Sequence, residues 1–188
     1  MAAWSTWSVW RMARVAASLF VLMVASYYFV VAFDNITNPV NPNASNWPFV
    51  RGVISGDGVP ADSGFGWRFI DATWFQALCY VGVVAAECIT CTLLIIASVK
   101  GLRASSTAAL WGHAQKWSIA GGIVGLALFF FGFMVVGGNW FIMYLNSKWN
   151  ALEPAFWSAV MTMFMVLLVI GVMIGGQLAR DEEMTAGG

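Results

Sequence analysis

Four long stretches of apolar residues constrain this chain more than any other feature. They cover residues 15–33, about 74–99, 117 to about 143, and 155–178. A hydrocarbon core about 30 Å thick requires about 20 apolar residues in a helix that rises about 1.5 Å per residue. A helix also satisfies its backbone amides internally, which lipid cannot do. The sequence therefore predicts an all-α integral membrane protein, a four-helix bundle that forms one domain over residues 1–188.

The composition agrees with a membrane environment and excludes several classes of function. Of the 188 residues, 60% are hydrophobic and 10% are charged, against about 25% charged in a typical soluble domain. Nine Lys and Arg residues balance nine Asp and Glu residues. A net charge of zero gives no electrostatic reason to expect a nucleic-acid partner. Membrane lipids are the expected surroundings.

The positive charges near the ends of the apolar stretches predict the orientation, because cytoplasmic loops carry an excess of Lys and Arg. Placing both termini in the cytoplasm puts more of these residues inside than outside. Those inside are Arg11, Arg14, Lys100, Arg103, Lys116 and Arg180, and those outside are Arg51, Arg68 and Lys148. We therefore expect a long, partly structured outer loop over residues 34–73, a cytoplasmic link over 100–116 and a short outer loop over 146–154.

Glu87 is the strongest candidate for a site residue, because it is the one charged residue in the second apolar stretch. An ionised carboxylate within a bilayer is costly unless it has a partner. We expect Glu87 to be protonated, to face another protein, or to accept hydrogen bonds from nearby polar side chains. The side chains that we expect to serve as partners are Thr90, Tyr27, Tyr28 and Thr162. Two interpretations stay open: a site for a proton, an ion or a cationic ligand, and a neutral acid that stabilises helix packing.

Other polar groups near the predicted outer surface receive different interpretations. Asn139 and Trp140 are candidates for the outer mouth of a Glu87 site. Asn35 begins an Asn-Ile-Thr triplet, which accepts a glycan only in a eukaryotic secretory setting, and we assign it no role.

Four glycines in the third and fourth stretches predict close helix packing. Gly121 and Gly125 are four residues apart, as are Gly171 and Gly175. Such pairs allow two helix backbones to approach closely. The contact is either within the bundle or with a partner.

The chain offers few groups for catalysis or metal binding. His113 is the one histidine and lies in the predicted cytoplasmic link, so haem and catalytic zinc lack ligands within the spans. Cys79, Cys88 and Cys91 lie in a predicted span, where a thiolate is poorly solvated. We therefore expect no catalytic residue, no metal and no cofactor, and no enzyme. A lipid or quinone held passively beside Glu87 is compatible with this expectation.

One segment resembles a known family. Residues 132–150, with the sequence GFMVVGGNWFIMYLNSKWN, resemble the signature of the bacterial family called domain of unknown function 2165, predicted small integral membrane proteins. The order of other motifs is similar: DNIT from Asp34, NWPFV from Asn46, Trp67-Arg68, and Ala-Glu-Cys around Glu87. The resemblance covers about residues 15–175.

The resemblance implies a four-helix protein of the bacterial inner membrane and implies no activity. One departure is Asn139, a position at which the family usually has Glu. A role that requires a second carboxylate there is therefore not carried over.

Two functions follow as hypotheses. The first is an accessory or structural subunit that packs against other integral membrane subunits, in a hetero-oligomer or homo-oligomer, because too few polar groups are present to hydrate a pore. The second is a small proton- or ion-coupled carrier that uses Glu87.

Overall fold

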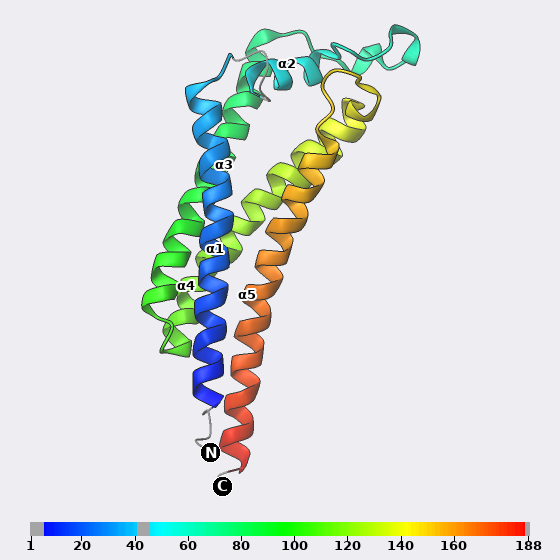
Figure 1. The fold of residues 1–188 in the computed structure, drawn as a ribbon. Coiled ribbons are helices and arrows are strands. Elements are labelled where there is room, and N and C mark those ends of the chain that lie inside the picture. The colour runs from blue at the N-terminus through cyan, green and yellow to red at the C-terminus, as the bar shows by residue number, and fades with distance from the viewer. Residues whose placement is uncertain (1–5, 41–45, 187–188) are drawn as a thin grey trace.

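A computed structural model describes residues 6–40 and 46–186, and their regular structure is entirely helical (Figure 1). The predicted domain and outer loop therefore include short segments that lie outside the described residues. The long helices are α1 (Thr6–Thr37), α3 (Thr73–Arg103), α4 (Ala108–Leu126), the π-helix η3 (Ala127–Trp140) that continues α4, and α5 (Leu152–Ala186). The short helices are α2 (Trp47–Ser55), η1 (Ala61–Ser63), η2 (Gly66–Arg68) and η4 (Met143–Leu145).

Four segments of the described chain are long and apolar enough to cross a membrane. They are Val9–Thr37, Thr73–Arg103, Ala108–Trp140 and Leu152–Ala179. The predicted membrane-spanning helical bundle is confirmed, and each helical segment is longer than the apolar stretch that predicts it. Residues with good helix propensity, such as Ala, Lys and Arg, flank several of these stretches and favour the longer helices.

The predicted link over residues 100–116 is wrong in its extent. α3 continues to Arg103 and α4 begins at Ala108. Lys100 and Lys116 therefore lie on helices, and the connection consists of a few residues. The prediction began and ended the cytoplasmic link at these charges, whereas long cationic side chains also fit the solvated end of a helix.

α1 packs against α3 and α5, and α4 packs against the same two helices. The buried residues of α1 recur every three or four positions, which places them on one face of the helix. They include Ser18, Val21, Ala25, Tyr28, Ala32 and Asn35. Small side chains bring α1 close to α3, where the Ser98 hydroxyl donates to the Ser18 carbonyl oxygen at 2.9 Å.

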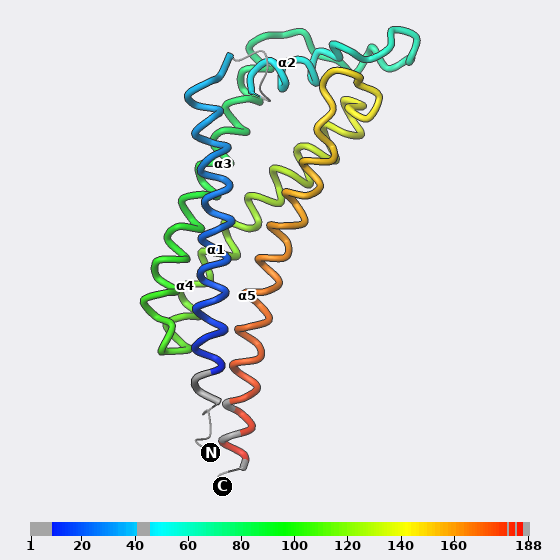
Figure 2. The backbone as a smooth tube through the Cα atoms, viewed as in Figure 1, coloured from blue at the N-terminus to red at the C-terminus, as the bar shows by residue number. Residues whose placement is uncertain are grey.

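The bundle opens toward one end. η3 and the first part of α5 diverge from α1 and α3, and α2 lies across the gap between the two pairs (Figure 1). We call this the α2 end. The described chain begins and ends at the opposite end, which we call the terminal end (Figure 2).

α2 covers the open end through an apolar face. Phe49, Val50, Val53 and Ile54 are buried and form a cluster with residues that follow η3, namely Phe141 and Met143. Asn46 fixes the start of α2, because its side-chain amide donates to the carbonyl oxygens of Asp34 and Asn38 at the end of α1. The loop after α1 therefore folds back over the bundle.

A second set of contacts fixes the far side of α2. The carboxylate of Asp57 accepts hydrogen bonds from the Trp149 indole at 2.9 Å and the Lys148 ammonium at 3.0 Å. These two partners lower the pKa of Asp57 below its ordinary value. The Asn146 amide donates to the Asp57 carbonyl oxygen at 2.9 Å. The loop after α2 is thereby tied to the loop before α5.

Candidate functional site

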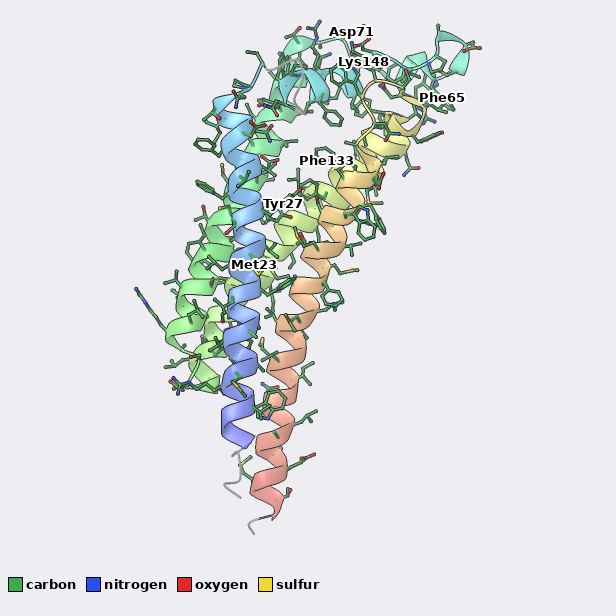
Figure 3. All side chains as sticks on the ribbon, in the orientation of Figure 1. Met23, Tyr27, Phe65, Asp71, Phe133 and Lys148 are labelled. Atoms are coloured by element: carbon green, nitrogen blue, oxygen red, sulfur yellow. The ribbon has the colours of Figure 1, made fainter. Side chains whose placement is uncertain are left out.

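A cavity of about 390 Å³ lies beneath α2 and is bounded by α1, α3, η3 and α5. Polar side chains from three helices and a loop line it: Tyr27, Asp34, Asn35, Asn46, Tyr80, Glu87 and Ser158. Phe49, Phe129 and Phe133 form much of its apolar wall. Figure 3 shows Tyr27 and Phe133 on the two helix pairs that enclose the space below α2. The cavity therefore exists because the bundle diverges at this end.

Glu87 lies in this cavity and is only 2% exposed. The side-chain amide of Asn35 donates to both of its carboxylate oxygens, at 2.8 and 3.1 Å. The Tyr80 hydroxyl donates to the Asn35 carbonyl oxygen at 2.6 Å, which holds that residue in place. Asn35 lies two residues before the end of α1. The carboxylate thus lies in the half of the bundle near the α2 end.

The expected hydrogen-bond partners of Glu87 are wrong. The Tyr27 hydroxyl instead pairs with Ser158 at 2.6 Å, and the Tyr28 hydroxyl pairs with Thr162 at 2.9 Å. Thr90 is fully buried one turn from Glu87, and its hydroxyl has no hydrogen-bond partner among the described residues. The Tyr27 and Tyr28 hydroxyls therefore link α1 to α5, and the Asn35 amide is the hydrogen-bond donor to the Glu87 carboxylate.

Sequence reasoning missed Asn35, although a signal was present. Val21, Tyr28 and Asn35 follow one another at intervals of seven residues, so they share a face of α1. All three are buried. A polar residue that continues a buried apolar stripe points to a partner inside the bundle.

The cavity is acidic. Asp34 provides a second carboxylate, and no Lys, Arg or His occurs among the described residues that line the cavity. Carboxylates and aromatic rings together favour a cation, since an aromatic face attracts positive charge. The described residues contain no group of three His, Cys, Asp or Glu side chains suited to a metal ion. The arrangement can hold a cation or exchange a proton.

Asn139 and Trp140 do not line the cavity that contains Glu87. The Arg68 guanidinium donates to the Asn139 carbonyl oxygen at 3.1 Å and lies 4.6 Å from the Phe65 ring centre and 5.7 Å from that of Trp140. Figure 3 shows Phe65 at the far tip of the α2 end, away from Tyr27. These residues tie η2 to the end of η3.

Three of the four predicted packing glycines make close contacts within the chain. A Cβ atom at Gly121 would lie 3.0 Å from Leu94, and one at Gly125 would collide with the Tyr28 hydroxyl. A Cβ atom at Gly175 would collide with Trp10, whereas one at Gly171 would meet nothing within 4 Å. Gly121 and Gly125 therefore permit contacts within the bundle.

A second cavity, of about 410 Å³, lies on the other side of a shared aromatic wall. Phe49 and Phe133 stack with ring centres 6.0 Å apart and line both cavities. The second cavity is bounded by α2, α3 and η3, and its lining side chains are apolar. The expectation of a lipid or quinone beside Glu87 stays a prediction.

Together these features define a small multi-pass helical membrane protein with a buried acid in a cavity at one end. The model of the family described as predicted small integral membrane protein (DUF2165) matches residues 13–172. The chain belongs to this family, and the resemblance of its motifs is confirmed. Searches among curated proteins and among solved structures gave no match.

Proposed function

We propose that this protein is a non-enzymatic membrane protein that binds a small organic cation at Glu87, from the α2 end. One observation carries the proposal: a nearly fully buried carboxylate accepts hydrogen bonds from a neutral amide in a cavity whose described lining has no basic side chain. A buried charge without a counter-charge is costly. A bound cation would supply that counter-charge.

The size and lining of the cavity favour an organic cation over a bare metal ion. Its volume of about 390 Å³ falls within the range of about 300–1,000 Å³ of small-molecule sites. Tyr27, Phe49 and Phe133 offer aromatic surface, which suits quaternary ammonium groups. The hydroxyl and amide groups of the lining could orient a primary amine.

Packing on the terminal side of Glu87 supports binding rather than a continuous pore. Tyr28, Leu94, Met165 and Val169 are fully buried there and belong to one apolar cluster. A hydrated path through this layer would need a different arrangement of the helices. The proton- or ion-coupled carrier therefore stays the second candidate, favoured by the intramembrane position of an acid within α3.

We also propose a role as an accessory subunit, which is compatible with a cation site at Glu87. Exposed rings at the α2 end, those of Trp67, Trp74 and Trp157, suit either the membrane interface or a neighbouring subunit. We propose lipids and other integral membrane subunits as partners, in the bacterial inner membrane with both termini cytoplasmic. Mass determination after purification in a mild detergent tests this role, and a lone monomer under all conditions would contradict it.

The cation site is tested with benzyltrimethylammonium, which carries both a quaternary ammonium group and a ring. Thermal unfolding of the purified protein in detergent is measured against the concentration of this probe. We expect the probe to raise the unfolding midpoint, and Glu87→Gln to weaken apparent binding at least about tenfold, because each 1.4 kcal/mol lost is a factor of ten.

Asp62→Asn is the matched control, because Asp62 is exposed on η1 and does not line the cavity. It removes one negative charge from the same end and should leave binding unchanged. Equal binding by wild type and Glu87→Gln, or no binding by wild type, contradicts the proposal.

A further inference from the structure

A wide groove of about 780 Å³ lies at the terminal end, between the end of α3 and the first half of α4. Its basic side chains are Lys100 and Arg103 from α3 and His113 and Lys116 from α4. The groove is open, in contrast to the cavity at Glu87. Nothing in the proposed cation site uses it.

Among the described residues, no acidic side chain forms an ion pair with the positive charges in the groove. No Asp or Glu lines the groove among the described residues. In the part of the chain that the structure describes, the ion pair with a nitrogen–oxygen distance below 4 Å is that between Lys148 and Asp57, at the α2 end. The Lys100 ammonium lies 5.2 Å from the Trp117 ring centre, which is a cation–π contact rather than neutralisation. The groove therefore presents uncompensated positive charge.

Helix stabilisation explains only part of this charge. Lys100 and Arg103 lie in the last turn of α3, where cations interact favourably with the helix dipole. Lys116 lies on a different helix, in the third turn of α4 after its start at Ala108, so the dipole of α3 does not account for it. Two helices thus direct cations to one groove.

The groove also has an apolar part, which continues along α4 from Trp117 to Ala120. Leu110 is 59% exposed and Trp117 is 39% exposed, and both line the groove beside the cations. Trp side chains favour the boundary between headgroups and acyl chains. An anionic headgroup and an acyl chain would therefore find matching surfaces next to each other.

We propose that this groove binds an anionic phospholipid. Its phosphate would lie between Lys100, Arg103 and Lys116, and one acyl chain would run along Trp117 and Ala120 toward the middle of the bundle. Basic pockets between transmembrane helices recognise anionic headgroups in this way. The proposal is independent of the cation site at Glu87, which lies at the other end.

The test compares lipids that share acyl chains and differ in charge. The full-length protein in detergent receives dioleoyl phosphatidylglycerol or dioleoyl phosphatidylcholine, and bound lipid is counted by native mass spectrometry. We expect phosphatidylglycerol to be retained in preference. Lys100→Gln with Lys116→Gln should weaken this retention about tenfold or more.

The matched control is Arg11→Gln with Arg51→Gln. It also removes two positive charges, from exposed residues outside the groove, and should leave retention unchanged. Each single substitution, Lys100→Gln and Lys116→Gln, should weaken retention about threefold or more. The single variants keep the test valid where the double variant does not fold.

Three results would overturn the proposal. One is unchanged retention in the double variant or in both single variants, and another is equal retention of phosphatidylcholine. The third is displacement of the lipid by millimolar inorganic phosphate, which would identify a site for a free anion rather than a lipid.

Discussion

The two ends of the bundle hold charged side chains in different environments, one buried and one open. At the α2 end, Glu87 is buried beneath a helix and accepts its hydrogen bonds from Asn35. At the terminal end, Lys100 and Lys116 line an open groove. α3 contributes to both regions, whereas α1 and α5 line only the cavity and α4 lines only the groove.

The comparison shows how burial decides what a charge requires. A buried carboxylate has lost water and must find a partner within the chain or in a ligand. An exposed cation keeps its water, so it adds little to stability and is available to an anion outside the protein. The acid should therefore respond to substitution of its neighbours more strongly than the cations do.

Asn35→Leu should have the largest effect on stability, because it removes the donor to both oxygens of Glu87. We expect a loss of roughly 2–4 kcal/mol in the free energy of unfolding, measured by circular dichroism in detergent. Adding Glu87→Gln should restore part of the loss, since the buried charge is then gone. Asn38→Leu, at an exposed amide of the same end, is the control. Equal losses at Asn35 and Asn38 would contradict this account.

Alanine substitutions at two glycines of α3 allow the packing at the two ends of the bundle to be compared. A Cβ atom at Gly101 would lie 2.5 Å from both Ser18 and Gln115, whereas one at Gly82 would meet nothing within 4 Å. Gly101→Ala should therefore cost roughly 1–3 kcal/mol. Gly82→Ala should be neutral, or stabilising by up to about 1 kcal/mol through helix propensity. Thermal unfolding of both variants measures the difference, and similar midpoints would show that the ends pack alike.

Asp57→Asn should have the smallest effect on stability. It should loosen α2, the helix that covers the cavity. It weakens the contacts to Trp149 and Lys148 and should cost about 1 kcal/mol or less, because the pair is exposed. Hydrogen exchange of the α2 amides should accelerate.

The pH dependence of the Asp57 contribution has a definite sign. The folded-state pKa of Asp57 is lowered from its ordinary value of 3.8. Its contribution is therefore fully present above that ordinary value and is lost as the pH falls through the lowered folded-state pKa. The difference in unfolding midpoint between wild type and Asp57→Asn should shrink below about pH 4, and a constant difference would contradict this assignment.

The sequence predicts some parts of this structure well for a physical reason. Each membrane-spanning segment satisfies its own backbone hydrogen bonds, so length and apolar content suffice to locate it. Gly121 and Gly125 were also recognisable, since only small residues allow close approach of helices. By contrast, the link between α3 and α4 was drawn too long, because cationic residues occur both in loops and at helix ends.

The candidate site was only half predictable. An acid within an apolar stretch is conspicuous, so Glu87 was found. Its partner was not, because the contact between Asn35 and Glu87 depends on how far α3 extends beyond α1 when the two helices pack. The cover by α2 was also hidden, since it depends on Asn46 and Asp57 contacting residues distant in sequence.

By itself, the amino-acid sequence determined that four helices cross a membrane and that one of them carries an acid, because both follow from the cost of placing polar groups in lipid. Only the tertiary structure decided that this acid lies in a covered cavity and that three cations share a groove. Those arrangements depend on the relative heights and divergence of the helices, which are set by contacts between residues far apart in the chain.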